Sequence, residues 1–131
     1  MDTRDVFISY SHADVDWVQR LLLPRLEARG FSVLIDFRDF KAGGFSVEQM
    51  ERAVESCRKV LIVLTPAYVA SDWGRFENVM AQTLDPAAVE RKIVPVLREQ
   101  CKVPLRLRVL HYRDLTSADA AQWERLINDL V

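Results

Sequence analysis

The chain has 131 residues, of which 50% are hydrophobic and 28% are charged, and its formal net charge at pH 7 is −1. This length and composition are typical of one globular domain that buries a core without disulfides or metals. The near-neutral charge argues against bulk attraction to nucleic acid or to an anionic membrane. Two cysteines without metal-site spacing, and no signal peptide or long apolar run, favour a reduced, cytoplasmic setting and no metal site.

Apolar runs alternate with amphipathic stretches from end to end. In chain order, strands are expected at residues 6–8, 31–36, 60–65, 93–97 and 107–112. Helices are expected from a cap at Ser11 or Asp14 to a stop at Gly30, over 47–57, over 71–84, and after a cap at Ser117. The unbroken apolar run at 60–65 suits a central parallel strand. The alternation predicts an α/β fold: a flavodoxin-like, doubly wound, five-stranded parallel sheet flanked by helices.

Two prolines should disturb these elements. Pro24 lies inside the first helix and should kink or break it, because proline has no N–H to donate. Pro95 lies inside the strand at 93–97 and places that strand toward a sheet edge or a bulge for the same reason.

The segment 37–46, between the second strand and the second helix, is expected to be a loop.

The sheet topology indicates where a ligand would bind. In doubly wound sheets, ligands sit beyond the carboxyl ends of the strands, at the switch point. The residues expected there are 10–12, 36–45 and those from Thr65 onward. The helix after Thr65 carries Trp73 and Glu77, which are four residues apart and therefore share a helix face. An indole and a carboxylate placed in this way could frame a ribose.

Several strings of the sequence together resemble a known family. Asp5-Val-Phe-Ile-Ser-Tyr-Ser11 is followed by an Asp after the second strand, a glycine-containing loop, and Ser71-x-Trp-x-x-x-Glu77. In this order and spacing they look like a Toll/interleukin-1 receptor (TIR) domain over essentially all of residues 1–131. The run Leu-Leu-Leu-Pro-Arg-Leu and the segment 36–40 look more like bacterial members than like animal receptors. The resemblance implies a single domain with the TIR fold.

Enzymatic TIR domains break the nicotinamide–ribose bond of NAD⁺, and the resemblance implies that Glu77 is the catalytic carboxylate, with NAD⁺ as substrate and no cofactor. A carboxylate suits this chemistry because glycosidic cleavage passes through an oxocarbenium-like state. The resemblance places these residues along the substrate: Tyr10, Ser11, His12, Asp36, Phe45 and Trp73. It places these residues in contact with a neighbouring TIR domain: Arg38, Phe40, Lys41, Gly43 and Gly44.

One departure from the family concerns the phosphates of the substrate. Some enzymatic members carry basic residues just after the first strand, where this chain has Ser11 and His12. Phosphate contacts would then be weaker, or would come from Arg38, Lys41 or backbone amides. Enzymatic members generally need self-association, in which the loop of one copy completes the site of the next. A head-to-tail contact of this kind does not close and builds filaments.

Two hypotheses about function remain open. The first is an NAD⁺ nucleosidase, hydrolase or cyclase, in bacterial defence or signalling; the alternative is a scaffold that binds other TIR domains, in which Glu77 is structural. A receiver domain is excluded because Leu64-Thr65-Pro66 occupies the place of its phosphorylatable Asp. No Rossmann glycine fingerprint supports hydride transfer. The trigger, the linear or cyclic product, and whether the chain is a fragment or acts with a sensor supplied in trans stay open.

Overall fold

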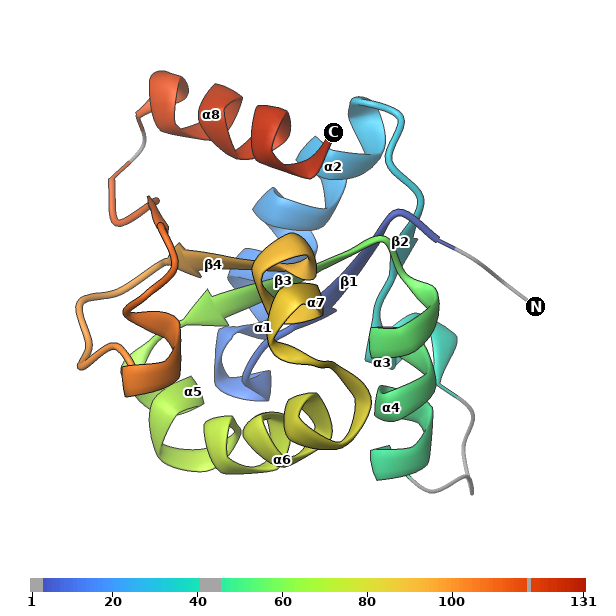
Figure 1. Cartoon of the computed structure of the whole chain (residues 1–131). Helices are drawn as coiled ribbons and strands as arrows, with labels where there is room; N and C mark the ends of the chain where they lie inside the picture. The colour runs from blue at the N-terminus through green and yellow to red at the C-terminus, as the bar shows by residue number, and fades with distance from the viewer. Residues whose placement is uncertain (1–3, 41–45, 118) are drawn as a thin grey trace.

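The computed structural model describes residues 4–40, 46–117 and 119–131. Five parallel strands form one sheet in the order β2-β1-β3-β4-β5 (Figure 1). Their bounds are β1 Val6–Ser9, β2 Val33–Leu34, β3 Lys59–Leu64, β4 Ile93–Leu97 and β5 Arg113–Asp114. This order confirms the predicted doubly wound sheet and places its switch point between β1 and β3.

The helical segments cover both faces of this sheet, as Figure 1 shows. In the first half of the chain they are η1 His12–Asp14, α1 Val15–Trp17, η2 Val18–Leu22, α2 Leu23–Ala28, α3 Asp36–Asp39 and α4 Ser46–Ser56. In the second half they are α5 Pro66–Ser71, α6 Trp73–Thr83, α7 Pro86–Lys92, η3 Leu105–Leu107 and α8 Ala120–Leu130. One apolar cluster packs η2, α2 and α8 on one face of the sheet, and a second packs α4, α5, α6 and η3 on the other.

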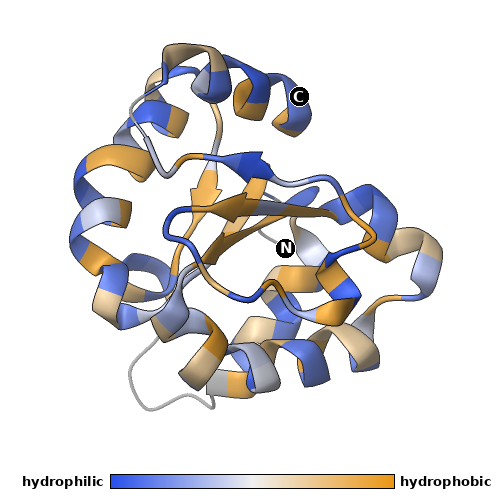
Figure 2. Cartoon of the chain, turned by 90° about the vertical axis from the view of Figure 1, so that its left-hand side faces the viewer, coloured by the Kyte–Doolittle hydropathy of each residue, from blue (hydrophilic) through white to orange (hydrophobic). Residues whose placement is uncertain are grey.

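The core is built on the central strands, which are the most hydrophobic part of the fold (Figure 2). In β3 every residue from Val60 to Leu64 is fully buried, and in β1 all four residues are buried. A strand covered on both faces needs apolar side chains on both faces, so its sequence reads as a continuous apolar run. The prediction made from the run at 60–65 is therefore confirmed.

The first helical segment is interrupted where the proline was expected to break it. The π-helix η2 precedes α2, which begins with Pro24 in its first turn. Because Pro24 has no N–H, the turn before it cannot continue the regular α-helical hydrogen bonds. Helix α2 ends at Ala28, and Gly30 follows two residues later with a φ of +89°, in the left-handed region that stops a helix. Both predictions are confirmed.

Pro95 does not put β4 at an edge, which corrects one expectation. Strand β4 lies between β3 and β5, with Pro95 opposite Ile62 of β3. The short β5, however, pairs only with Val96 and Leu97. Pro95 therefore has a hydrogen-bonding neighbour on one side alone, and its missing N–H costs no second ladder bond.

The predicted elements at 107–112 and after Ser117 are also corrected. Leu107 ends the 3₁₀ turn η3 and is fully buried, while Val109 is 82% exposed, so this segment packs through single side chains and not as a strand. Strand β5 follows it. Helix α8 is capped by Asp119, which accepts a hydrogen bond from the Ala121 N–H (2.9 Å), and not by Ser117.

The segments around the expected loop and the expected middle helix also differ in detail. Instead of loop alone, α3 forms one helical turn right after β2, with the Ile35 N–H donating to the carboxylate of Asp39 (2.8 Å). Instead of one helix over 71–84, the chain forms α5 and α6, which meet at Asp72. Thr65 caps α5 by accepting a hydrogen bond from the Tyr68 N–H (3.1 Å).

Candidate functional site

A cleft of about 280 Å³ lies at the carboxyl end of β1, next to the switch point of the sheet. Four parts of the chain line it: β1 and the residues after it, the α3 region, α4, and the junction of α5 and α6. The residues are Phe7, Ile8, Ser9, Tyr10, Ser11, His12, Asp36, Phe40, Met50, Ser71, Asp72, Arg75 and Phe76. The sheet topology therefore brings four of the predicted substrate residues together at this edge, namely Tyr10, Ser11, His12 and Asp36.

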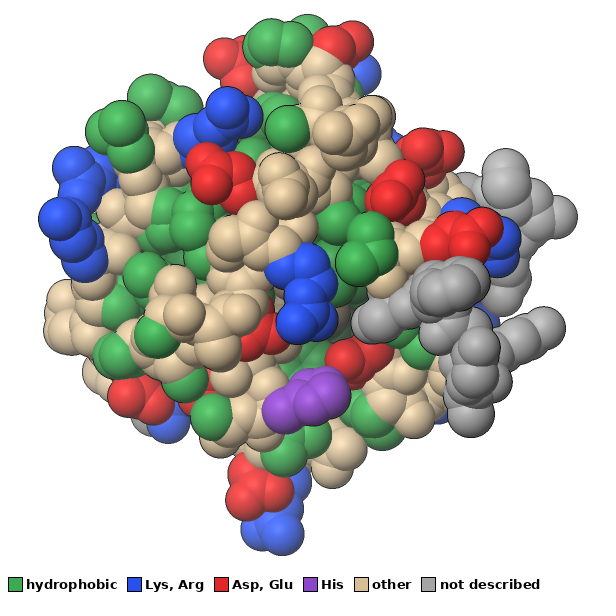
Figure 3. Space-filling model, turned by 90° about the horizontal axis from the view of Figure 1, so that it is seen from below, with side chains coloured by type: hydrophobic (Ala, Val, Ile, Leu, Met, Phe, Trp, Pro, Cys, Tyr) green, Lys and Arg blue, Asp and Glu red, His purple; other side chains and the backbone are tan. Residues whose placement is uncertain are grey.

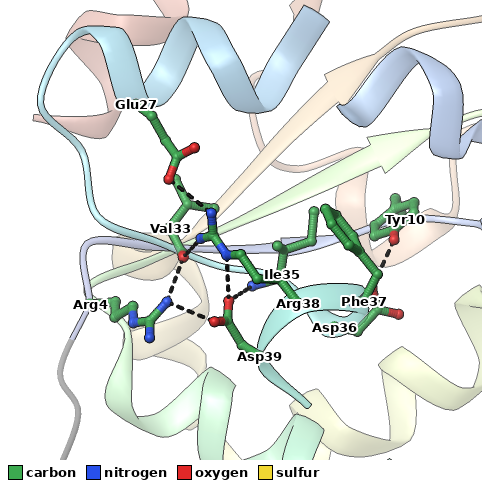
Figure 4. A network of polar contacts seen from close by, with 9 residues as sticks. All are labelled: Arg4, Tyr10, Glu27, Val33, Ile35, Asp36, Phe37, Arg38 and Asp39. Atoms are coloured by element: carbon green, nitrogen blue, oxygen red, sulfur yellow. Dashed lines mark hydrogen bonds and ion pairs between the residues drawn. The ribbon is translucent and has the colours of Figure 1, made fainter. Parts of the chain in front are cut away.

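The carboxylate of Asp36 is the best-defined polar group of the cleft. Its Oδ1 accepts hydrogen bonds from the Tyr10 hydroxyl (2.8 Å) and the Phe37 N–H (2.7 Å), and its Oδ2 lies 2.9 Å from His12 Nε2. Burial, followed by the hydrogen bond to Asp36 and its charge, raises the pKa of Tyr10 above its ordinary value. The Tyr10 phenol therefore stays a donor, and it fixes the carboxylate (Figure 4).

Ser11 and His12 differ in how far they reach solvent. Ser11 is 4% exposed, and its Oγ accepts a hydrogen bond from the Ala13 N–H (3.2 Å), so its hydroxyl caps η1. The His12 side chain is 77% exposed, with its ring 5.7 Å from the ring of Tyr10. Of the two, His12 is therefore the one free to contact a ligand with little rearrangement.

Two hydrogen bonds, one buried and one partly buried, hold the strand ends beneath the cleft. The hydroxyls of Ser9 and Tyr68 are 2.8 Å apart and join β1 to α5. The Thr65 hydroxyl donates to the Asp14 carboxylate (2.6 Å) and so joins the end of β3 to η1. These bonds fix the carboxyl ends of the two central strands relative to each other, and with them the position of Tyr10.

Helix α6 presents two adjacent sides, and only one of them lines the cleft. Phe76 lines it, together with Asp72 and Arg75, which are spaced as neighbours on one helix face. Trp73 and Glu77 are not among the described lining residues. Trp73 packs into the second apolar cluster with its ring 6.3 Å from that of Phe76.

The carboxylate of Glu77 lies in an ion pair with Arg106, whose Nε is 3.1 Å from Glu77 Oε2. The side chains of Glu77 and Arg106 are 39% and 58% exposed. The structure therefore places the residue predicted to be catalytic on the helix that forms the cleft wall, with its charge directed to a neighbouring surface arginine.

The residues predicted to contact a neighbouring domain fall into two groups. Arg38 is engaged within the chain, donating to the Val33 carbonyl (2.6 Å) and the Glu27 carboxylate (3.0 Å), as Figure 4 shows. Phe40 lines the cleft and stacks on Phe7 with ring centres 6.0 Å apart. The others, together with the predicted substrate residue Phe45, lie outside the described residues: Lys41, Gly43 and Gly44.

Residues of α4 and of the α5–α6 junction were missed by sequence reasoning, although a signal for three of them was present. In the string 71–77 the spacing of Asp72, Arg75 and Phe76 is as helical as that of Trp73 and Glu77. The polar Asp72 and Arg75 beside an apolar Phe76 could have indicated a half-buried cleft wall. Met50, in contrast, comes from a helix whose packing the sequence pattern does not reveal.

Neither a metal site nor a membrane span appears in the part of the chain that the structure describes. Among residues 4–40, 46–117 and 119–131, no group of three or more His, Cys, Asp or Glu side chains is placed to hold a metal ion. In the same ranges, each helix is too short or too polar to cross a bilayer.

The fold and the cleft together define a doubly wound α/β domain with a small polar site at its switch point. The family model described as "TIR domain" matches residues 6–127, and the chain therefore belongs to the TIR domain family.

Three comparisons illustrate this membership. Toll-like receptor 4 of Pongo pygmaeus is 32% identical over 127 residues, which cover 94% of this chain and 15% of the receptor. The crystal structure of the TIR domain of the Toll-related receptor TRR-2 from Hydra magnipapillata matches with a TM-score of 0.83 and 26% identity, covering 98% of both chains. A metazoan TIR-STING receptor from C. gigas matches with a TM-score of 0.76 and 28% identity over 97% of this chain and 40% of its own.

Proposed function

We propose that this TIR domain cleaves the nicotinamide–ribose bond of NAD⁺, by hydrolysis or cyclisation, when copies of it associate. The observation that carries the proposal is the Asp36 carboxylate in the cleft, fixed by Tyr10, His12 and the Phe37 amide. A fixed carboxylate is a strong acceptor for the hydroxyls of a ribose. The cleft lies where ligands bind in folds of this topology.

Glu77 is the residue proposed to stabilise the ribosyl cation. Nicotinamide leaves as a neutral base from a cationic sugar linkage, so the reaction needs negative charge near the ribose more than a general acid. Glu77 has to turn away from Arg106 to supply that charge. An ion pair between side chains this exposed is worth at most about 1 kcal/mol, so the rotation is inexpensive.

Self-association is the second part of the proposal, through the segment that follows β2. The cleft volume of about 280 Å³ lies just below the range of ligand sites, which begins at roughly 300 Å³, and an adjoining copy would extend the cleft. A contact between unlike surfaces of successive copies propagates into filaments. Association would also raise the local concentration of sites on a signalling platform.

The test is nicotinamide release from NAD⁺ by the domain tethered densely on beads. Wild type should release nicotinamide and Glu77→Ala should not. Glu124→Ala is the matched control, because Glu124 is also an exposed helical carboxylate paired with an arginine, Arg29 (2.7 Å), but on α8 on the other face of the sheet. Release by the control at the wild-type rate separates loss of catalysis from loss of a surface charge. Equal release by wild type and Glu77→Ala would contradict the assignment.

A second candidate function is protein interaction without chemistry. The observation that favours it is the Glu77–Arg106 pair, which gives Glu77 a surface role outside the residues lining the cleft. A domain that clusters, stays folded and leaves NAD⁺ intact would be such an interaction module. The same bead assay, with association measured alongside by light scattering, therefore decides between the two functions.

A further inference from the structure

The charged side chains that line the cleft differ in how many hydrogen bonds they make. Asp36 accepts three hydrogen bonds, and Asp72 accepts one from the Ser71 hydroxyl (2.5 Å). Arg75 also lines the cleft and is exposed. Within the described part of the chain, no hydrogen bond or ion pair engages the Arg75 side chain. The cleft therefore has carboxylates that already have donors and a guanidinium with its donors unused.

Of the two other cations expected to reach a phosphate, Arg38 lies within the described residues and does not line the cleft. The guanidinium of Arg38 is taken up by Glu27 and by a β2 carbonyl. Lys41 lies outside the described residues. Arg75, in the first turn of α6, is the arginine that the described structure places at the cleft with no hydrogen bond to its guanidinium.

The two kinds of group select different parts of a ligand. A guanidinium presents paired N–H donors that match the oxygens of a phosphate. The Asp36 carboxylate accepts hydrogen bonds from hydroxyls. A ribonucleotide carries both, with its phosphate a few bonds from its ribose hydroxyls. A cleft of about 280 Å³ suits one nucleotide unit better than a whole dinucleotide.

We propose that Arg75 is the phosphate-binding residue of the cleft, holding the phosphates of a nucleotide whose ribose contacts Asp36. The inference rests on the proposed function, because NAD⁺ contains such a unit, and it adds to that function the group that replaces the basic residues missing after β1. His12, exposed beside Asp36, then lies at the ribose end of the cleft.

The experiment measures binding of ADP and of adenosine to the whole chain by isothermal titration calorimetry, in the free and in the bead-clustered state. Arg75→Gln removes the guanidinium charge. Arg125→Gln is the matched control, since Arg125 is an exposed arginine of α8 on the opposite face and the change in net charge is the same. Thermal unfolding of both variants establishes that they are folded.

Arg75→Gln should weaken ADP binding roughly 10- to 100-fold, the usual effect of a charge-assisted contact, while adenosine binding stays within about twofold. Added salt should weaken ADP binding by wild type more than by Arg75→Gln. Arg125→Gln should behave as wild type.

Equal ADP binding by the two variants would overturn the assignment, and so would a wild type that binds no ADP in either state. Failure of NAD⁺ cleavage is a separate result. If the domain binds ADP through Arg75 yet releases no nicotinamide, the assignment of Arg75 stands and the proposed enzymatic function fails. If the wild-type domain cleaves NAD⁺ and the Arg75→Gln variant binds ADP as tightly as wild type, the proposed enzymatic function stands and the assignment of Arg75 fails.

Discussion

Gly30→Ala isolates the free-energy cost of one backbone conformation. At the end of α2, the N–H groups of Gly30 and Phe31 donate to the carbonyls of Glu27 (3.0 Å) and Leu26 (3.2 Å), which is the Schellman pattern. A Cβ at Gly30 would meet nothing within 4 Å, so the substitution causes no clash. What remains is the left-handed φ of +89°, which costs alanine roughly 1–2 kcal/mol. At about 4 °C per kcal/mol for a chain of this length, Tm should fall by roughly 4–8 °C.

Gly74→Ala is the matched control, with the opposite sign. Gly74 lies in the first turn of α6, outside the left-handed region, and a Cβ there also meets nothing within 4 Å. Alanine should stabilise this helix by about 0.5–1 kcal/mol and raise Tm by roughly 2–4 °C. Gly30→Asn should lose less than Gly30→Ala, because asparagine tolerates the left-handed region. Scanning calorimetry and urea denaturation measure all three, and shifts of the same sign in both alanine variants would refute the reasoning.

Three further predictions concern Cys57, Tyr10 and Arg106. Burial raises the pKa of the Cys57 thiol from 9.0 to about 11, so on raising the pH the unfolded chain loses this proton before the folded chain does. The free energy of unfolding should therefore be unaffected below pH 9 and should fall by up to about 1.4 kcal/mol per pH unit between pH 9 and 11. Urea titrations of Cys57→Ala should show no such slope. Tyr10→Phe removes a donor to the half-buried Asp36 carboxylate and should cost about 1 kcal/mol of unfolding free energy, whereas no loss would mean that water replaces the phenol. Arg106→Ala frees Glu77 and should raise nicotinamide release by clustered domains up to about fivefold; a decrease would mean that the pair supports the reaction.

The parts of the fold that follow from sequence are those governed by burial on both faces. The runs 6–8 and 60–64, which form most of β1 and β3, are apolar at every position, and a short unbroken apolar run between turn residues is typical of a buried strand. Once the parallel order is expected, the carboxyl ends of these strands must share an edge. Tyr10, His12 and Asp36 could therefore be assigned to one site before any coordinates.

The errors arise where a few tertiary contacts outweigh local pattern. Residues 107–112 read as a strand, but burial of the single side chain of Leu107 draws the segment into a 3₁₀ turn and delays the strand by several residues. The prediction of the site from sequence is limited in the same way. Helical spacing places Trp73 and Glu77 on one face, but it does not say which face of α6 meets the cleft. That depends on how the helix is rotated against the sheet, which is decided by the packing of Phe76 and its neighbours.

The edges of the sheet restrict how copies of this domain can join. Strands β2 and β5, which form the two edges, are each two residues long. In β2 the Val33 carbonyl is already occupied by guanidinium groups of Arg4 (2.8 Å) and Arg38 (2.6 Å), as Figure 4 shows. Edges this short, with one carbonyl of β2 already bonded, offer little backbone for another strand to pair with. Copies that gather would be joined mainly through side chains, such as the acidic and basic ones scattered among hydrophobic ones on the face in Figure 3. An assembly held in this way could come apart on dilution or in salt with every protomer still folded.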